Sequence, residues 1–308
     1  MAIAEDARSP VQGVELWVSK DDALVLKSGA YGPHSEFARV SARSRFRYGE
    51  GLPGAVWATE RALVWHELGS HFVRSELAAA AGIDAAIGFP WYRGSELAGV
   101  VTLLLTSHTP ASACIEIWNH DDGIDVLRHG GGLYVNTPEL RQLSELLQFP
   151  YAAGLPGLTW STGMPVVFQD VRASNEFVRA ELAARAGLKR AVGVPIFRQR
   201  RVSHVLTLLG AESAPFIRAF ELYTQGELGL VEKIRFDEFA PTSALDAPSG
   251  RYTEKELAEE ARTSRMPVIY CGGTVSRSAR GTTARDGVHV ALPVHDGTRL
   301  RGVACLEF

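Results

Sequence analysis

Two arginines at matching places in the sequence are the charged side chains best suited to hold an anion. Arg74 follows Phe-Val and precedes Ser-Glu-Leu-Ala-Ala, and Arg179 follows Phe-Val and precedes Ala-Glu-Leu-Ala-Ala. A guanidinium matches the geometry of a carboxylate or phosphate, so both arginines are candidate ligand-binding residues. The alternative is a local salt bridge that anchors each predicted helix to the sheet or to the loop before it.

Two histidines lie just before the first arginine. His66 and His71 flank a polar loop beside Trp65. Neutral imidazole is a common ligand of metals and haem, so the pair is a candidate ligand site. The matching segment around Phe168 has no histidine. This difference favours the alternative, two loop histidines without a ligand, and we predict no metal site.

Aromatic side chains complete the candidate ligand-binding set. Trp17 and Trp118 occupy matching strand positions, and Trp91 stands where the second copy has Ile196. Such rings line ligand pockets, but buried tryptophan also forms ordinary core. The ligand-binding candidates are therefore Trp17, Trp65, His66, His71, Arg74, Trp91, Trp118, Phe168 and Arg179.

Catalytic chemistry has little support in the sequence. The cysteines Cys114, Cys271 and Cys305 are far apart and odd in number, which is typical of free thiols in a reducing compartment. A thiol redox enzyme needs a nucleophile with a resolving partner nearby. No Ser-His-Asp set, paired-carboxylate motif or phosphate loop is evident. We expect a non-enzyme without catalytic residues, with thiol redox activity as the less favoured alternative.

The elements that position these residues repeat along the chain. Gly-Leu-Pro-Gly occurs at 51–54 and again at 154–157, each time followed by a tryptophan, Trp57 or Trp160. Proline suits the first turn of a helix, so each motif predicts a helix that enters from a strand. Both tryptophans are expected to be largely buried. Gly163 supplies a stop signal in the second copy, whereas Glu60 in the first copy supplies none.

This self-similarity predicts three domains, at residues 1–110, 111–213 and 214–308, of which the third is degenerate. Within the third, a helix is expected over 253–262, a loop over 272–286 and a closing strand over 300–308. Helices of about ten residues, such as 72–81 and 176–185, alternate with antiparallel hairpins. The predicted fold class is α+β, with helices packed on a curved antiparallel sheet.

The ordered motifs resemble the GAF domain of bacterial sensors. Glu-Leu-Trp at 15–17, Gly-Glu-Gly-Leu-Pro-Gly-x-Val-Trp at 49–57, Phe-Val-Arg at 72–74 and Gly-Phe-Pro at 88–90 carry the resemblance, which is strong over two copies and weak over the third. It implies a PAS-like sheet with a ligand pocket between one face and the covering loops and helices. Ligands of the family include cyclic nucleotides, tetrapyrroles, haem, small anions and amino acids. The cyclic-nucleotide signature and a bilin-attaching cysteine are absent.

Composition narrows the classes of partner. The 308 residues are 46% hydrophobic and carry a net charge of -3, so no basic footprint for nucleic acid exists. No apolar run is long enough for a membrane span, and the first residues lack a secretion signal, so a cytoplasmic protein is expected.

These observations predict a non-catalytic sensor or regulatory protein that binds a small molecule, an effector protein or both; the cofactor is unknown. Short, proline-containing linkers between the copies leave no room for a signalling helix, so action in trans on a separate effector is expected. The alternatives are an interaction scaffold whose pockets are filled by its own side chains and, less favoured, a thiol-dependent redox enzyme. A second copy of the chain, in a homodimer, is one candidate partner.

Overall fold

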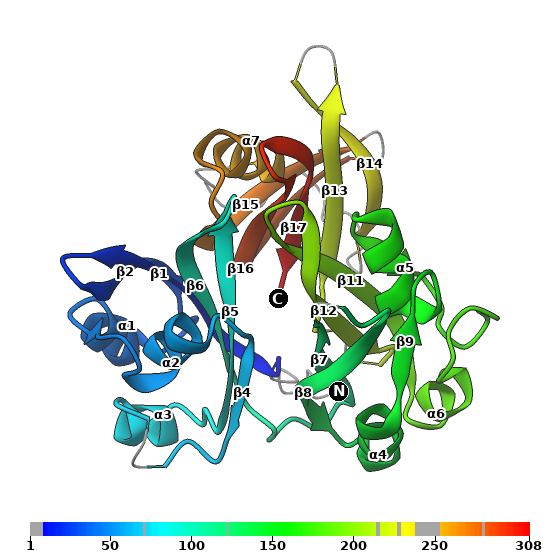
Figure 1. Cartoon of the computed structure of the whole chain (residues 1–308), viewed down its shortest axis with the longest axis horizontal. Helices are drawn as coiled ribbons and strands as arrows, with labels where there is room; N and C mark the ends of the chain where they lie inside the picture. The colour runs from blue at the N-terminus through cyan, green and yellow to red at the C-terminus, as the bar shows by residue number, and fades with distance from the viewer. Residues whose placement is uncertain are drawn as a thin grey trace.

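Three antiparallel sheets surround a common centre, and the helices lie at the periphery (Figure 1). This computed structural model describes residues 9–69, 72–121, 123–213, 216–226, 229–237, 253–278 and 281–308. Most of the described chain is strand, so the predicted α+β class holds only in the coarse sense of antiparallel sheets covered by short helices. No helix in these segments is long and apolar enough to cross a membrane.

The first sheet has six strands in the order β3-β2-β1-β6-β5-β4. Its strands are β1 (Val11–Lys20), β2 (Ala23–Ala30), β3 (Arg45–Phe46), β4 (Leu63–His66), β5 (Ala85–Arg93) and β6 (Glu96–Leu105). Three helices accompany it: α1 (Ser35–Ser41), α2 (Gly51–Thr59) and α3 (Ser75–Ala80).

The second sheet, read as β9-β8-β7-β12-β11-β10, has the same strand order as the first. Its strands are β7 (Ala113–His120), β8 (Val126–Val135), β9 (Gln148–Pro150), β10 (Val166–Phe168), β11 (Leu188–Arg198) and β12 (Arg201–Ala211). Its helices are α4 (Pro138–Leu146), α5 (Gly154–Thr162) and α6 (Ala180–Arg185). The repeated motifs do not include α4 or its helix start, Thr137 followed by Pro138, and three glycines at 130–132 interrupt the apolar pattern of β8.

The third sheet has five strands in the order β14-β13-β17-β16-β15, which matches the first sheet without its β3. The strands are β13 (Ala219–Gly226), β14 (Gly229–Asp237), β15 (Val268–Ser278), β16 (Gly281–Asp296) and β17 (Arg299–Glu307), and the helix is α7 (Glu254–Ser264). The closing strand β17 lies at the centre of its sheet. The loop expected over 272–286 is wrong, since ladder pairing continues from Gly272 opposite Gly287 to Ser278 opposite Gly281.

Strand alternation divides each sheet into an inner and an outer face. In β1, Val14 and Leu16 join the central core, whereas Trp17 belongs to a separate cluster beneath the helices. Successive side chains of a strand point to opposite faces, so a strand buried on both faces has an almost continuous apolar sequence. This explains runs such as Val100–Leu105, whose side chains are all buried.

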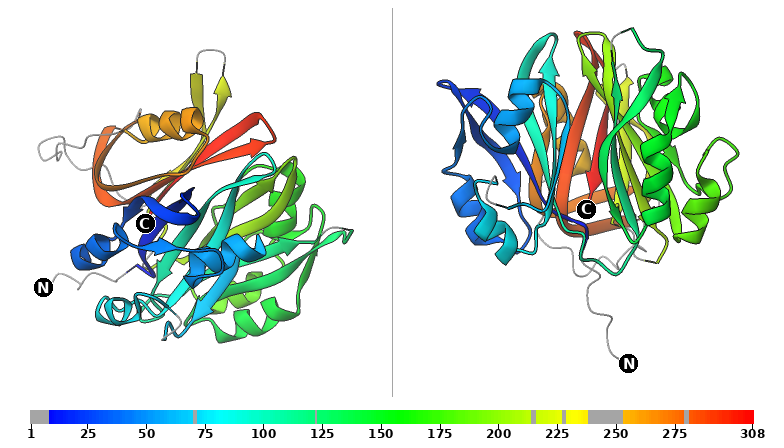
Figure 2. Two further views of the ribbon diagram at one scale, coloured as in Figure 1. Left: turned by 60° about the vertical axis from the view of Figure 1, so that its left-hand side comes forward. Right: turned by 60° about the horizontal axis from the view of Figure 1, so that its bottom comes forward.

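The inner faces of the three sheets share one hydrophobic core. Its members include Ile87 from the first sheet, Ile117 from the second and Leu306 from the third. Figure 2 shows the third sheet packed against the other two, with α7 on its outer side. The predicted domain repeats therefore do not have separate interiors on this side, because each covers apolar surface of the others.

Helices α2 and α5 approach their sheets at matching glycines. A Cβ on Gly88 would lie 2.8 Å from Val56, and a Cβ on Gly193 would lie 2.2 Å from the Thr159 hydroxyl. The prediction that both motif tryptophans are largely buried is wrong. Trp57 and Trp160 are only half-buried, because each lies one residue beyond the position that faces the glycine and so projects about 100° around the helix.

Three helix boundaries also differ from expectation. The first motif helix ends at Glu60, which takes the left-handed conformation (φ 52°) that Gly163 takes after α5 (φ 59°). The first copy therefore also ends its helix with a left-handed residue, but this residue is a glutamate, which the sequence does not mark as a helix end. The helices expected over 72–81 and 176–185 are shorter, because Arg74 and Arg179 precede the first helical residue as N-caps.

Candidate functional site

Each sheet carries a buried glutamate on its outer face, two residues before a buried aromatic side chain. The pairs are Glu15 with Trp17, Glu116 with Trp118, and Glu221 with Tyr223. Across the ladder these glutamates lie opposite Thr102, Thr207 and Cys305 respectively. The three sheets therefore place a carboxylate at one equivalent position, beneath the layer of helices.

In the first sheet, Glu15 is the acceptor at the centre of a hydrogen-bond cluster. Its carboxylate accepts hydrogen bonds from Trp17 Nε1 at 3.0 Å and from the Tyr31 hydroxyl at 3.0 Å. Arg74 donates to both carboxylate oxygens, with Nη2 to Oε2 at 3.0 Å, and also to the Ser41 hydroxyl. Ser41 lies at the end of α1, so one arginine joins a strand, a helix end and the turn before α3.

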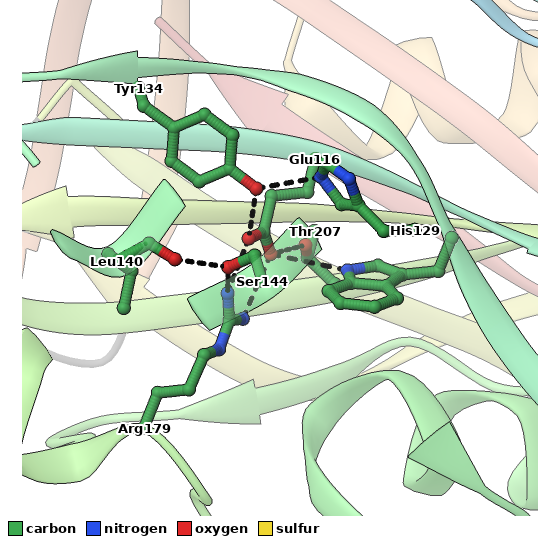
Figure 3. Close-up of polar contacts among 8 residues, drawn as sticks. Glu116, His129, Tyr134, Leu140, Ser144, Arg179 and Thr207 are labelled. Carbon is green, nitrogen blue, oxygen red and sulfur yellow. Dashed lines mark hydrogen bonds and ion pairs between the residues drawn. The ribbon is translucent and has the colours of Figure 1, made fainter. Parts of the chain in front are cut away.

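The second sheet repeats this arrangement (Figure 3). Arg179 Nη2 donates to Glu116 Oε2 at 2.9 Å, and Nη1 donates to Glu116 Oε1 and to the Ser144 hydroxyl. Tyr134 donates to Glu116 Oε1 at 2.8 Å and Thr207 donates to Oε2 at 2.9 Å. Every oxygen of the carboxylate is thus occupied by donors from the protein itself.

Burial and charge compete at Glu116, and charge prevails. Burial opposes ionisation, but the charge of Arg179 and hydrogen bonds from Arg179, Tyr134 and Thr207 lower the pKa of Glu116 to about 2. Burial, followed by the charge of Glu116, raises the pKa of Tyr134 well above its usual value, so its hydroxyl stays protonated as a donor. The pair is therefore a fixed ion pair at neutral pH and is not poised for proton transfer.

Both guanidinium groups also lie against aromatic rings. Arg74 Cζ is 4.7 Å from the centroid of Phe37 and 5.4 Å from that of Trp17. Arg179 Cζ is 5.5 Å from Phe177 and 5.6 Å from Trp118. The arginine side chains and the aromatic rings around them thus occupy the space between the sheet and the helices, and cation–π contacts add to the ion pairs. Both arginines form a salt bridge with a glutamate of the sheet, and this salt bridge anchors the turn before the helix. The contacts therefore match the second interpretation of these arginines.

The third cluster has the same glutamate with different neighbours. Tyr223 donates to Glu221 Oε2 at 2.5 Å. Glu254 at the start of α7, His289 and Glu307 are buried around the same small space, whose volume is about 10 Å³. A cavity of this size holds about one water molecule.

The remaining candidates are dispersed. Trp65 is half-buried on β4, His66 is exposed at the end of that strand, and His71 lies outside the described residues. Phe168 is half-buried with its ring centroid 6.0 Å from that of Phe177. Trp91 points inward and belongs to the core shared by the three sheets, away from the helix layer. In the part of the chain that the structure describes, no three His, Cys, Asp or Glu side chains form a metal-binding group.

The thiols differ in exposure. Cys114 and Cys305 are buried, and burial raises the pKa of each thiol well above its usual value. Cys271 is exposed on β15. A raised pKa keeps a thiol protonated and so lowers its nucleophilicity.

Sequence reasoning found the arginines but missed their partners. A usable signal was present: Glu15, Glu116 and Glu221 are single charged residues inside otherwise apolar strands. A charge in a strand that is buried on both faces requires a partner of opposite charge. The hydroxyls of Tyr31, Tyr134 and Ser144 left no such signal, because these residue types occur equally at the surface.

Comparisons with known proteins give partial structural likenesses. No family model matches the chain, and no curated protein matches it. Among solved structures, it is similar to free methionine-R-sulfoxide reductase from Neisseria meningitidis in complex with its substrate, with 21% identity and a TM-score of 0.25 over 32% of this chain and 51% of that one.

Two GAF domains are also similar to parts of the chain. One is from A. aeolicus, with 24% identity and a TM-score of 0.26 over 31% of this chain and 58% of that one. The other is from a phosphoenolpyruvate-protein phosphotransferase of Coxiella burnetii, with 22% identity and a TM-score of 0.28 over 34% of this chain and 59% of that one. The matched segments thus span little more than half the length of these three proteins.

Proposed function

We propose that this chain is a non-catalytic regulatory protein of three GAF-like units, at residues 1–110, 111–213 and 214–308, that acts in trans on a separate effector protein. The observation that carries the proposal is the pair of buried clusters around Arg74 and Arg179, which fill the space between sheet and helices with the protein's own side chains. In GAF domains a ligand can occupy the space between the sheet and the covering helices. In these two units the buried ion pairs occupy that space and hold the helices against the sheet.

The state of the thiols supports a role without catalysis. Two of the three cysteines are buried with a raised pKa. Cys271 is exposed but lies on β15, at an outer edge of the third sheet, whereas Cys305 lies on the central strand β17. A redox site would require a reactive thiolate with a resolving thiol beside it.

A repeated apolar surface supports action through a partner protein. Val73 is 57% exposed and its counterpart Val178 is 60% exposed, while Tyr48 and Tyr151 are 65% and 59% exposed. In each unit the exposed tyrosine ring lies edge-on to the half-buried motif tryptophan, at 5.4 Å and 5.0 Å. Exposed apolar side chains that lie together mark interaction sites, and in each unit the tyrosine and tryptophan rings are in contact.

Helix α7, whose run of acidic residues is another candidate surface for a partner, turns part of its charge inward. Lys255, Glu256 and Glu260 are exposed, but Glu254 is 6% exposed and faces the third sheet. The charge that α7 offers to a partner is therefore smaller than the run of acidic residues predicts.

The test is affinity capture from the native host with quantitative mass spectrometry. We expect the wild-type protein to recover one effector protein in a fixed ratio. Val73→Asp and Val178→Asp, which alter exposed side chains only, should abolish recovery. Leu146→Asp, at a residue that is 82% exposed and outside the repeated surface, should leave recovery unchanged.

Two outcomes would contradict the proposal. One is recovery of the protein alone, combined with a sedimentation mass of two chains, because a homodimer would then account for the surface. The other is reduction of free methionine sulfoxide by the purified protein with a thiol reductant, lost in the Cys271→Ser variant, because this would make the chain an enzyme.

A further inference from the structure

A basic cavity of about 680 Å³ opens at one end of the third sheet, away from the clusters around Arg74 and Arg179. It lies where β13 and α7 end and where β16 turns into β17, and the segment after α5 closes one side. Its volume falls within the range of small-molecule sites. The lining residues are Met164, Thr224, Gln225, Arg262, Arg265, His295, Thr298, Arg299, Leu300 and Arg301.

Positive charge dominates this lining. Four of the ten residues are arginines and none is a carboxylate. Arg262 pairs with Glu259 at 2.6 Å, and Arg301 donates to the Thr162 carbonyl at 3.0 Å and lies 3.8 Å from Asp296. These contacts hold two guanidinium groups in place at the rim. Arg265 and Arg299 have no carboxylate at ion-pair distance within the described residues.

His295 adds polar groups that lack partners. Neither ring nitrogen has a hydrogen-bond partner among the described residues, although both atoms are buried. Burial, followed by the charge of Arg265, lowers the pKa of His295 to about 4, so the ring is neutral near pH 7. A neutral imidazole has one donor and one acceptor to offer, and unsatisfied buried polar atoms favour a site that a ligand completes.

The backbone at Arg265 allows its side chain to be tested separately from the fold. Arg265 caps α7 with φ 55°, in the left-handed region that favours glycine. The matching place in the second unit, between a Ser or Thr and Met-Pro, is Gly163 with φ 59°. Glycine would be the residue of lower strain at this cap, as it would at Glu60 in the first unit, so Arg265→Gly removes the guanidinium without adding backbone strain.

We propose that this cavity binds a small organic molecule that carries a diphosphate or longer polyphosphate group. Several guanidinium groups around one cavity match adjacent phosphates, because each can donate two parallel hydrogen bonds. Thr224, Gln225 and Thr298 supply further polar contacts, and Met164 and Leu300 supply apolar surface for the organic part. The concave shape and the overall charge of -3 favour a small ligand over nucleic acid. The proposal is independent of the role in trans.

The test is isothermal titration calorimetry of the full chain at constant ionic strength. We expect ADP and inorganic pyrophosphate to bind at least about tenfold more tightly than orthophosphate, because they engage more than one guanidinium. Arg299→Ala and Arg265→Gly should each weaken ADP binding by about tenfold or more. Arg265→Gly should also leave the thermal midpoint at or above that of wild type, because glycine relieves the strained cap.

Two control variants separate the site from general effects. Arg43→Ala removes an exposed arginine outside the cavity, and Glu60→Gly makes the same backbone change at the first unit's helix cap. Both should bind ADP as the wild type does. Equal affinities for orthophosphate and pyrophosphate, unchanged binding in Arg265→Gly and Arg299→Ala, or tighter binding of a single-stranded RNA than of ADP would each overturn the proposal.

Discussion

The two buried arginines show how a side chain suited to bind a ligand can serve the fold instead. Arg179 is 2% exposed and Glu116 is fully buried. Taking two charges out of water is costly, so such a pair is stable only when hydrogen bonds satisfy both groups. Tyr134, Thr207 and Ser144 supply those bonds. The pair therefore fixes the turn before α6 against strand β7.

Breaking this pair should be strongly destabilising. We expect Arg179→Met to lower the free energy of unfolding by about 3–5 kcal/mol, because Glu116 is left buried without its counter-charge. Chemical denaturation measures the loss. In the double variant Glu116→Gln with Arg179→Met, the loss should be smaller than the sum of the two single losses. Arg185→Met, which breaks the exposed pair with Glu139, should cost less than about 1 kcal/mol.

If Arg179→Met proves as mild as Arg185→Met, the guanidinium is not a structural element. The other interpretation, an arginine that binds an anionic ligand, would then be favoured for the second unit. Restored stability on addition of a small anion would support that alternative further.

Among the elements, the motif helices show how one fold tolerates different end signals. Glu60 and Gly163 have nearly the same left-handed backbone at matching helix ends. Only glycine adopts this conformation without strain. Glu60 keeps its place with an exposed ion pair to Arg198 and a hydrogen bond from Tyr92 to its carbonyl at 2.9 Å.

Glu60→Gly should therefore stabilise the protein. We expect a gain of up to about 1 kcal/mol in the free energy of unfolding, since relief of strain exceeds the loss of an exposed ion pair. Urea denaturation of Glu60→Gly and Glu60→Ala distinguishes the causes. The alanine variant loses the same ion pair but gains no backbone freedom, so a gain shared by both variants would disprove the strain explanation.

The close approach of α5 to β11 means that Gly193 should tolerate a side chain less well than Gly210 on the next strand. A Cβ on Gly193 would lie 2.2 Å from Thr159 and 3.1 Å from Leu155, so Gly193→Ala forces the helix away from the sheet. We expect a loss of about 1–3 kcal/mol by chemical denaturation. Gly210→Ala on neighbouring β12 is the control, because its Cβ would meet nothing nearer than 3.6 Å. Equal losses would mean that helix packing is not the cause.

At the scale of the whole molecule, the shared core joins the three sheets. Trp91, Ile117 and Leu306 come from three different sheets and belong to one buried cluster. The turns between the long strands are also in contact. The backbone N–H of Gln199 donates to the Gly94 carbonyl at 2.7 Å, and the backbone N–H of Gly297 donates to the Gln199 carbonyl at 2.8 Å. Each unit thus leaves its inner face uncovered when the others are removed.

Residues 1–110 alone should not form a stable monomer. The inner face of the first sheet, with Ile87, Phe89 and Trp91, would be exposed to water, and exposed apolar surface of this size drives association. We expect more self-association in sedimentation analysis and more binding of a hydrophobic dye than the full chain shows under the same conditions. A monomeric fragment with a cooperative unfolding transition would show that the units are independent domains.

The contact between the first and second sheets should also depend on pH. His204 is 5% exposed, and its Nε2 accepts a hydrogen bond from the Ala62 backbone at 3.2 Å. Burial, followed by the charge of Arg61, lowers its pKa to about 4, and nearby Arg198 acts in the same direction against Asp121. The unfolded state thus binds the proton more readily than the folded state. The stability that neutral His204 contributes is therefore present above about pH 6.5 and is lost as the pH falls towards 4.

The loss assigned to His204 should reach up to about 3 kcal/mol between these limits. Denaturation measured from pH 7 to pH 4 should show a smaller decline in His204→Gln than in the wild type. His108→Gln, at a side chain that is 81% exposed, should decline as the wild type does. An identical decline in all three proteins would exclude His204 as the cause.

The sequence by itself determined the repeated elements. Gly-Leu-Pro-Gly predicts both motif helices, and the strand patterns predict hairpins such as β1–β2 and the closing strand β17. These signals are local, because each depends on backbone preferences within a few residues. The same reasoning identified Arg74 and Arg179 as special residues from their recurrence alone.

Only the tertiary structure decided what those residues do. Whether Arg179 meets a ligand or Glu116 depends on a contact across 63 residues of chain, and no local pattern encodes that choice. Burial of Trp91 likewise depends on the neighbouring sheets, since the same strand would expose it in an isolated unit. The basic cavity depends on turns and helix ends that are far apart in sequence, because a cavity is a property of packed surfaces and has no period along the chain.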